Sequence, residues 1–182
     1  GHANTATSQP VGAAQAAYLI YTSGSTGTPK AVAVSQANLA HYAAGVLHAL
    51  ALPETATLAA LSSVTADLGY TAWFGALLGG RTLRILDDAL TEDPEGLAAA
   101  LEAEPVDCLK IVPSHYKALL AVANPGRIVP RRCIVFGGEA LDPALVGTVQ
   151  ALSATCRVFN HYGPTETTVG CVAAPAEPAA GA

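Results

Sequence analysis

The sequence contains no methionine, few aromatic residues and little charge, and these shortages exclude several classes of protein. Charged residues make up only 13% of the 182 residues and the net charge is -5, so the chain has no basic surface for nucleic acid or an anionic membrane. No apolar run reaches the roughly 18 residues that suggest a membrane-spanning helix. Hydrophobic residues make up 51%, too many for a disordered chain. We therefore expect one folded domain, with neither nucleic acid nor membrane as a partner.

The four cysteines do not form the patterns of a disulfide framework or a zinc site. No two of them are spaced as a CxxC pair, and three of them lie in apolar runs. This pattern is typical of small core residues in a reducing compartment, so we expect a cytoplasmic protein. Because the sequence lacks methionine and its Gly1-His2 start resembles the scar of a cleaved tag, we expect a piece of a longer open reading frame.

Between two low-complexity ends, short β-branched runs alternate with helical patterns. We expect a tag scar and flexible lead-in over residues 1–15, a core domain over 16–172 and a disordered tail over 173–182. Alternation of strands and helices predicts an α/β fold with a doubly wound, mostly parallel sheet and helices on both faces. The expected strands cover residues 18–21, 31–34, 57–61, 82–86, 108–112, 133–136 and 157–160.

Five helical patterns fill the gaps between these strands. One begins after Ser35 and a second covers about residues 68–78. A third begins after Thr91. Pro113 and Pro143 suit the first turns of two more helices, because proline lacks the N–H that a first turn leaves unpaired.

The first expected strand ends in a loop rich in glycine and hydroxyl groups. Residues 22–30 contain five hydroxyls, two glycines and one lysine. Glycine lets backbone N–H groups approach an anion, while hydroxyls and lysine add donors and positive charge, so the loop suits phosphate. A Walker loop does not fit, because Pro29 and Ala31 flank the lysine. A flavodoxin phosphate loop is closer, and a flexible Ser/Gly turn is the plainer interpretation.

A second polar segment, residues 160–167, follows the strand expected at 157–160. Ligands of open α/β sheets bind at the carboxyl ends of strands. Tyr162 can stack on a base, Thr165 can donate to a phosphate, and Glu166 can hold Mg²⁺. The plainer interpretation is a tight Gly-Pro turn with a capping threonine.

Three segments, in the same order along the chain, resemble the signatures of the adenylate-forming superfamily. YTSGSTGTPK resembles its phosphate loop, GGEAL resembles the segment that borders the adenine, and NHYGPTET resembles its N-x-Y-G-P-T-E motif in the style of nonribosomal peptide synthetase adenylation domains. The resemblance spans about Tyr18 to Val172 and implies the central, flavodoxin-like subdomain of such an enzyme, with ATP and Mg²⁺ as cofactors. It implies nucleotide contacts from Thr22, Ser23, Gly24, Ser25, Thr26, Gly27, Gly138, Glu139, Ala140, Asn160 and Tyr162. It also implies catalytic roles for Lys30, Thr165 and Glu166, with Glu166 as the metal ligand.

Members that activate amino acids resemble this chain in one more stretch, where an F-D-x-S pattern supplies an aspartate for the substrate's α-ammonium. Asp67 occupies that position here, although Ala66 and Gly69 replace the flanking Phe and Ser; without the resemblance, Asp67 reads as a helix cap. Carried over one by one, the substrate-binding positions fall on Asp67, Leu68, Thr71, Lys110, Val135, Gly137, His161 and Val169. They resemble the specificity code for aspartate, whereas the asparagine code differs at Val135 and His161. The resemblance therefore implies L-aspartate, or a β-methyl- or β-hydroxy-aspartate, as substrate.

Lys110 is informative by itself, because lysine is seldom buried without a partner. It lies in an apolar strand, where it either points into a pocket or extends along the strand edge to solvent. A lysine inside a pocket demands an anionic or strongly polar ligand.

The resemblance implies that aspartate reacts with MgATP to give aspartyl-AMP, which is then loaded onto the phosphopantetheine thiol of a carrier domain. The family's upstream core and its small C-terminal domain have no counterpart in this sequence. We therefore expect these subdomains as partners and expect the isolated chain to be inactive. The competing hypotheses are a flavodoxin-like flavin-binding module and a non-catalytic recognition module.

Overall fold

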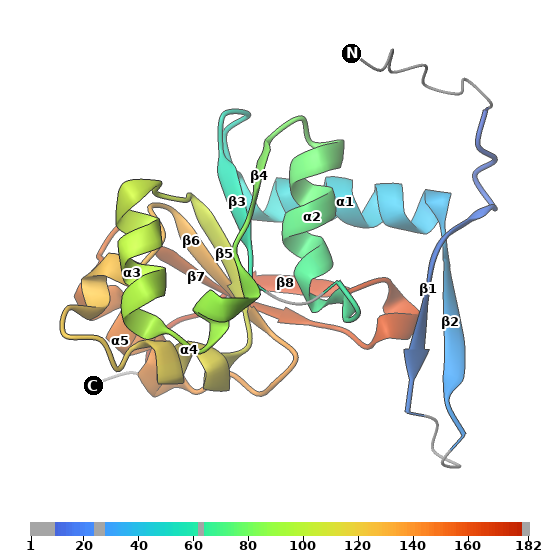
Figure 1. Ribbon diagram of the computed structural model, residues 1–182. Coiled ribbons are helices and arrows are strands. Elements are labelled where there is room, and N and C mark those ends of the chain that lie inside the picture. Colours follow the sequence, from blue (N-terminus) through green and yellow to red (C-terminus); the bar gives the residue numbers. More distant parts are fainter. Residues whose placement is uncertain (1–9, 24–27, 62–63, 180–182) are drawn as a thin grey trace.

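The computed structural model describes residues 10–23, 28–61 and 64–179, which form a six-stranded sheet and a separate two-stranded sheet (Figure 1). The strand order in the large sheet is β4-β3-β5-β6-β7-β8. The strands are β1 (Ala16–Thr22), β2 (Lys30–Ser35), β3 (Thr57–Ala60), β4 (Thr82–Ile85), β5 (Cys108–Ile111), β6 (Cys133–Gly137), β7 (Arg157–Tyr162) and β8 (Val172–Pro175). The helices are α1 (Gln36–Leu50), α2 (Tyr70–Leu78), α3 (Pro94–Ala103), α4 (Pro113–Leu119) and α5 (Pro143–Leu152), with 3-10 turns η1 (Asp67–Gly69), η2 (Asp88–Thr91), η3 (Pro125–Ile128) and η4 (Thr165–Thr167).

Strands β3 to β7 are paired in parallel, and helices cover both faces of the sheet. Because side chains alternate along a strand, the large sheet contributes to two cores. Leu58 and Val135 pack with α1 and α2 on one face, whereas Ala59 and Ile134 pack with α3, α4 and α5 on the other. The expected doubly wound α/β fold is confirmed.

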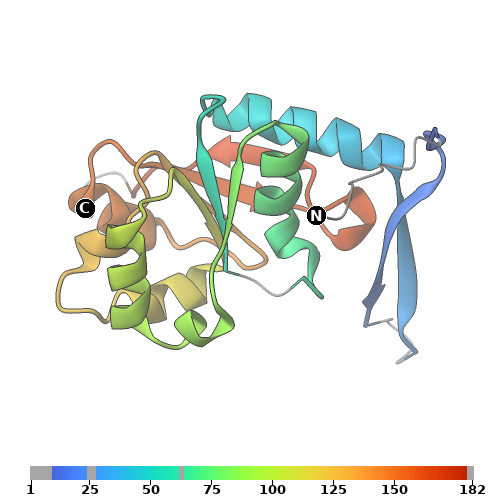
Figure 2. The same ribbon diagram turned by 45° about the horizontal axis from the view of Figure 1, so that its top comes forward.

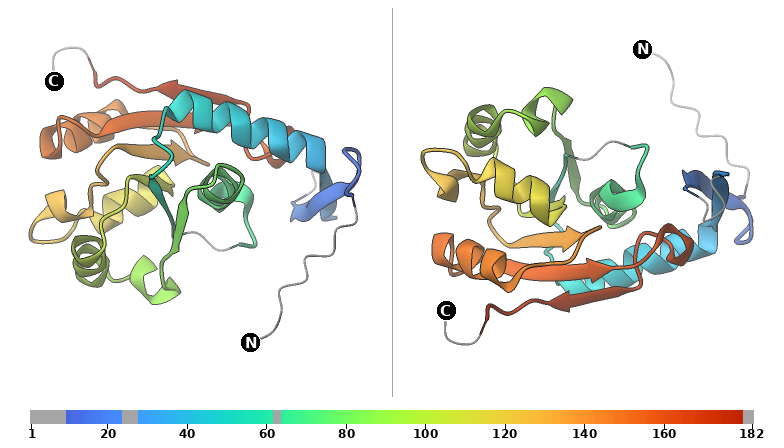
Figure 3. Two further views of the ribbon diagram at one scale, coloured as in Figure 1. Left: turned by 90° about the horizontal axis from the view of Figure 1, so that it is seen from above. Right: turned by 90° about the horizontal axis from the view of Figure 1, so that it is seen from below.

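Three strands at the margins differ from the expectation. Strands β1 and β2 were both expected, but they pair with each other antiparallel and stand apart from the large sheet (Figure 2). Residues 172–175, placed mainly in a disordered tail, form β8, which pairs antiparallel with β7 and runs beside α1 (Figure 3). The expected end of the folded domain at residue 172 is therefore too early. An alanine-rich edge strand is held by backbone hydrogen bonds, which composition does not reveal.

The helix starts follow local capping chemistry. The Ser35 hydroxyl caps α1 by accepting a hydrogen bond from Asn38 N at 3.2 Å. Helix α3 begins at Pro94 rather than after Thr91, because Asp93 caps it through a hydrogen bond from Gly96 N at 2.9 Å. Within the described ranges, no helix is both long and apolar enough to cross a bilayer.

The strand order places a topological switch between β3 and β5. The chain leaves β3 through α2 to reach β4 on one side, and then returns through α3 to β5 on the other side. Open α/β sheets bind ligands outside the carboxyl ends of their strands at such a point. A ligand site is therefore expected among the residues that follow β3 and those at the end of β5.

Candidate active site

Four of the eight predicted substrate-binding residues gather at the carboxyl ends of β5, β6 and β7, on the sheet face covered by α1 and α2. Lys110 pairs with Val135, and Gly137 pairs with His161, across neighbouring strands. All four share this face because they are spaced by even numbers of residues from Cys108, Cys133 and Phe159, which pack in the same core. The prediction that these positions lie together is consistent with the strand register.

Lys110 is buried rather than extended to solvent, with only 1% of its surface exposed. Its Nζ lies 3.1 Å from His161 Nδ1. Gly137 leaves room for the ammonium, because a Cβ there would overlap Nζ. Burial lowers the pKa of Lys110 to about 7, and the lysine forms no ion pair in the described part of the chain. The alternative of a lysine extending to the strand edge is wrong.

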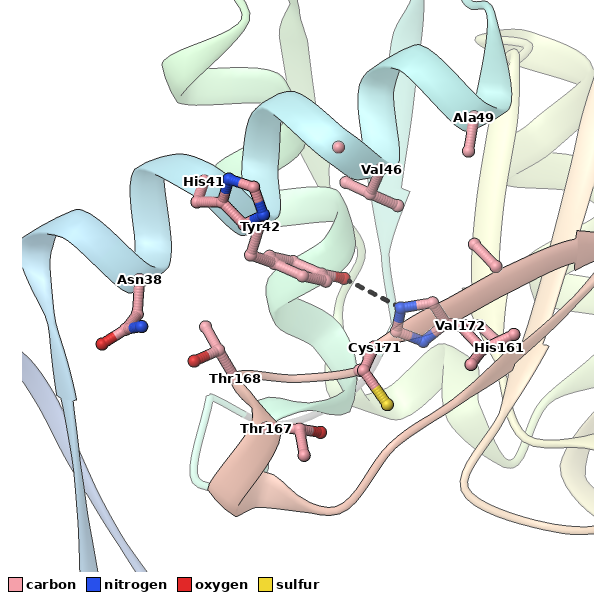
Figure 4. Close-up of a pocket in the computed structure, with 13 residues that line it drawn as sticks. Asn38, His41, Tyr42, Val46, Ala49, His161, Thr167, Thr168, Cys171 and Val172 are labelled. Carbon is pink, nitrogen blue, oxygen red and sulfur yellow. Dashed lines mark hydrogen bonds between the residues drawn. The ribbon is translucent and has the colours of Figure 1, made fainter.

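His161 connects this lysine to a tyrosine that the sequence did not single out. His161 is 4% exposed, and its Nε2 lies 3.3 Å from Tyr42 Oη (Figure 4). Tyr42 Oη in turn lies 2.8 Å from Thr71 Oγ1. Burial, and then the charge of Lys110, lower the pKa of His161 to about 3, so its imidazole is neutral. Lys110, His161, Tyr42 and Thr71 thus form one buried chain of hydrogen bonds.

Asp67 stands at the start of η1, in the connection that follows β3. Its Oδ2 is buried and has no hydrogen-bond partner among the described residues. Burial raises the pKa of Asp67, and a hydrogen bond from Thr165 opposes that rise. Asp67 caps neither neighbouring helix, since the N-caps of η1 and α2 are Ala66 and Gly69. An unpartnered buried carboxylate oxygen is costly unless a cation or donor meets it.

Apolar and glycine residues complete the surroundings of these charges. Leu68 is half-buried, while Val135 and Val169 are buried. Val169 has a φ of 65°, a left-handed conformation that costs a β-branched residue about 1–2 kcal/mol. The next residue, Gly170, has no side chain because a Cβ there would overlap the His161 ring. The sequence-based site omitted Gly170 and Tyr42; Tyr42 shares the buried face of α1 with Leu39 and Val46 and therefore reads as a core residue.

The predicted nucleotide-binding residues lie on the more exposed part of the same region. Strand β2 contacts η4, so the hairpin that carries Thr22 and Lys30 packs beside the turn that carries Thr165 and Glu166. Tyr162 is 67% exposed at the end of β7 and is free to stack on a planar group. Ser23, Lys30, Gly138, Ala140, Asn160 and Glu166 are also exposed. Gly24, Ser25, Thr26 and Gly27 lie outside the described residues.

Glu139 already has a structural role at the start of α4. Its carboxylate accepts hydrogen bonds from Ser114 N at 3.0 Å and from Ser114 Oγ at 2.7 Å. These bonds lower the pKa of Glu139. The carboxylate is therefore occupied, which leaves the backbone of residues 138–140 for any contact with a base.

A preformed metal site is absent from the described residues. They contain no group of three or more His, Cys, Asp or Glu side chains that could hold a metal ion. Mg²⁺ commonly binds to one or two carboxylates together with substrate phosphates. A single exposed carboxylate, that of Glu166, fits this second kind of site.

A cavity of about 390 Å³ lies between α1 and the segment that joins η4 to β8 (Figure 4). Tyr42, His161, Thr168 and Cys171 are among its lining residues, and Lys110 is not. The hydrogen bond between Tyr42 and His161 therefore lies at the cavity wall.

Comparison with known proteins agrees with this arrangement. The model of the AMP-binding enzyme family matches residues 2–181. Surfactin synthase subunit 2 of Bacillus subtilis (strain 168) is 34% identical over 165 residues, which are 89% of this chain and 5% of that protein. The dimodular nonribosomal peptide synthase of the same organism is 35% identical over 158 residues, 87% of this chain and 6% of that protein. The chain thus spans only a small part of these curated relatives.

A solved structure extends the similarity to the fold. The adenylation domain AlmE of Vibrio cholerae, in complex with glycyl-adenosine-5'-phosphate, has a TM-score of 0.80 and 26% sequence identity. The match covers 94% of this chain and 32% of that chain. The family match favours the adenylate-forming hypothesis over a flavin-binding module. This chain belongs to the family of AMP-binding enzymes.

Proposed function

We propose that this chain is the substrate-selecting part of a nonribosomal peptide synthetase adenylation domain, and that its substrate is L-aspartate or a β-substituted aspartate. The natural protein would convert the amino acid and MgATP to aspartyl-AMP and pyrophosphate, and then load the acyl group onto a carrier-protein thiol. The similarity to a nonribosomal peptide synthase, and to a structure that contains glycyl-adenosine-5'-phosphate, supports this class of reaction.

The observation that carries the choice of aspartate is the burial of Lys110. Its ammonium has a neutral imidazole as its neighbour and no carboxylate in ion-pair contact among the described residues. A buried cation without a counter-ion is unfavourable by several kcal/mol. A substrate that brings a carboxylate to Nζ supplies the missing charge, and the side chain of aspartate does so.

Asp67 supplies the second point of recognition. Its buried Oδ2 lacks a partner in the part of the chain that the structure describes, and the α-ammonium of an amino acid is a cation of suitable size to meet it. Asp67 and Lys110 therefore complement the ammonium and the side-chain carboxylate of one aspartate molecule. Asparagine fits less well, because its amide N–H groups need acceptors and His161 Nδ1 already faces Lys110.

In the proposed reaction, an oxygen of the substrate α-carboxylate attacks the α-phosphorus of ATP, and the bond to the departing pyrophosphate oxygen breaks. Asp67 and Lys110 would hold the amino acid so that its α-carboxylate faces the nucleotide. Thr165 and Lys30 would donate hydrogen bonds to phosphate oxygens, and Tyr162 would stack on the adenine. Glu166 would hold Mg²⁺, which neutralises phosphate charge when bound.

The test of this proposal is Lys110→Ala in the full-length natural protein, assayed by amino-acid-dependent ATP–pyrophosphate exchange. Truncating one partner of a buried charge pair costs about 2–5 kcal/mol. We therefore expect kcat/KM for L-aspartate to fall by a factor on the order of 10² or more. L-alanine should lose far less, because it brings no second charge.

Lys117→Ala is the matched control, because Lys117 is an exposed lysine of α4 that pairs with Asp142 at the surface. It should leave the preference for aspartate over alanine unchanged. Asp67→Ala should weaken both substrates alike, since it removes the partner of the ammonium that they share. An unchanged preference in Lys110→Ala would show that Lys110 does not face the substrate, and the aspartate proposal would lose its physical basis.

A further inference from the structure

The chain of hydrogen bonds behind Lys110 contains a residue from outside the predicted site. Tyr42 lies in α1, and its hydroxyl contacts both His161 Nε2 at 3.3 Å and Thr71 Oγ1 at 2.8 Å. The rings of Tyr42 and His161 meet edge to face, with centroids 5.8 Å apart. The hydroxyl therefore joins the imidazole to the first turn of the helix that follows Asp67.

The donors and acceptors in this chain have a definite order. A charged Lys110 has three N–H donors and no acceptor, so Nδ1 of His161 must accept. The imidazole is neutral, so its one proton then lies on Nε2. On the other side, a phenol is the better donor and an alcohol the better acceptor, and 2.8 Å is a typical O–H···O distance, which assigns the Tyr42 proton to Thr71 Oγ1. The Tyr42 oxygen then faces Nε2 as an acceptor.

We propose that Tyr42 is a positioning residue for Lys110: its hydroxyl holds His161 as the Nε2–H tautomer, so that Nδ1 accepts from Lys110 and the ammonium keeps its place over Gly137. This inference rests on the proposed function only for its effect on substrate choice. The tautomer itself is a property of the protein without any ligand.

The surroundings explain why the hydroxyl matters. Nε2 lies at the wall of the cavity of about 390 Å³, and Tyr42 lines the same cavity. Replacing the hydroxyl by hydrogen leaves Nε2 facing space that water can enter, and water can either donate or accept. The preference for Nε2–H then depends on Lys110 alone. Above pH 7 that preference is weak, because burial lowers the pKa of Lys110 to about 7 and a neutral amine can accept as well as donate.

The direct experiment is nitrogen-15 NMR of the histidine rings in the 182-residue chain, above pH 7, for wild type and Tyr42→Phe. The chain has five histidines, and the resonances of His161 are those that His161→Gln removes. In wild type we expect one nitrogen with the shift of a protonated ring nitrogen and one with that of an unprotonated nitrogen, assigned to Nε2 and Nδ1. In Tyr42→Phe the two shifts should move toward each other as the second tautomer becomes populated.

Tyr116→Phe is the matched control, because Tyr116 is a buried tyrosine of the opposite core whose hydroxyl has no hydrogen-bond partner within residues 10–23, 28–61 and 64–179. It should leave both nitrogens of His161 unchanged. Should Tyr42→Phe not fold, Thr71→Val breaks the chain one bond further away and should move the same two shifts in the same direction. Unchanged shifts in the folded variant, or an Nδ1–H tautomer in wild type, would overturn the proposal.

A kinetic experiment on the full-length natural protein tests the consequence for the substrate. Tyr42→Phe should raise KM for L-aspartate about tenfold, the effect of one lost buried hydrogen bond, with kcat nearly unchanged. In a His161→Leu background the same substitution should have almost no further effect, because Tyr42 acts through the imidazole. Additive effects would overturn the positioning role. If wild type does not use aspartate, the proposed function fails, whereas the NMR result still decides the role of Tyr42.

Discussion

At the scale of single residues, the site combines polar groups that are costly to bury and that satisfy one another only in part. Lys110, His161 and Thr71 are all buried, and hydrogen bonds connect them through Tyr42. Within the described residues, the ammonium of Lys110 still lacks an anion, and Asp67 Oδ2 still lacks a donor. Two complementary deficits in one region are typical of a binding site whose ligand supplies the missing groups.

The lowered pKa of Lys110 predicts that aspartate binding depends on pH. In the empty pocket this pKa is about 7, and a bound carboxylate would raise it. Above pH 7, binding therefore requires proton uptake, and affinity for aspartate should fall by up to about tenfold per pH unit. Below pH 7 the lysine is already charged and this dependence should disappear. Isothermal titration of the full-length natural protein with L-aspartate in buffers of different ionisation enthalpy would measure both the affinity and the proton uptake.

The other groups around Lys110 do not produce the same dependence. His161 stays neutral, since its pKa is lowered to about 3, and a hydrogen bond with Cys133, followed by burial, raises the pKa of the Cys108 thiol. In the proposed site, Asp67 would contact the ammonium that all amino acids share, so L-alanine is the control that reports on the titration of Asp67. An equal pH dependence for alanine and aspartate would contradict the role given to Lys110.

Single residues also show which parts of the candidate site can be predicted from the sequence and which cannot. A lysine within an apolar strand is conspicuous, so the sequence pattern alone singles out Lys110. It does not single out Tyr42, because an aromatic residue on the apolar face of a helix usually packs in a core, and only the tertiary structure brings its hydroxyl to His161. The same holds for Gly170, whose missing side chain matters only because the His161 ring packs against it.

At the scale of elements, the alternation of side chains along strands does most of the positioning. Lys110, Gly137 and His161 fall on one face of the sheet because of their spacing within β5, β6 and β7. The doubly wound sheet that carries this face could be predicted, because the sequence shows apolar strand runs and helices that begin with proline. Strand β8 could not be predicted, because its pairing with β7 uses backbone groups and its sequence is rich in alanine and proline.

A substitution at Gly137 tests whether the close approach of Lys110 to the backbone at the end of β6 is required. A Cβ at this position would overlap Lys110 Nζ and lie 2.7 Å from the carbonyl oxygen of His161. Gly137→Ala should therefore lower the free energy of unfolding by about 1–3 kcal/mol. Urea denaturation of the 182-residue chain measures this difference.

Gly147→Ala in α5 is the matched control. The nearest atom to a Cβ there is Pro178 Cβ at 3.8 Å, an ordinary contact. Because alanine favours a helix over glycine, this substitution should raise the free energy of unfolding by about 0.5–1 kcal/mol. A Gly137→Ala protein as stable as wild type would mean that Lys110 and β7 can move aside, and that the packing of Lys110 against Gly137 is not tight.

At the scale of the whole molecule, strand order explains where the site is. The switch between β3 and β5 places Asp67, which follows β3, near Lys110, which lies close to the end of β5, and each influences the pKa of the other. The fold class and the region of the site follow from the alternation of strands and helices. The antiparallel β1-β2 hairpin outside the main sheet does not follow from this alternation, because strand patterns alone do not specify which strands pair with each other.

The most direct test of the central claim is ATP–pyrophosphate exchange by the full-length natural protein, measured in parallel with each of the twenty amino acids. We predict that L-aspartate gives the highest kcat/KM, because it alone combines an ammonium for Asp67 with a short carboxylate side chain for Lys110. Asparagine should be clearly poorer, and apolar amino acids poorer still. A preference for an apolar amino acid or for asparagine would contradict the account.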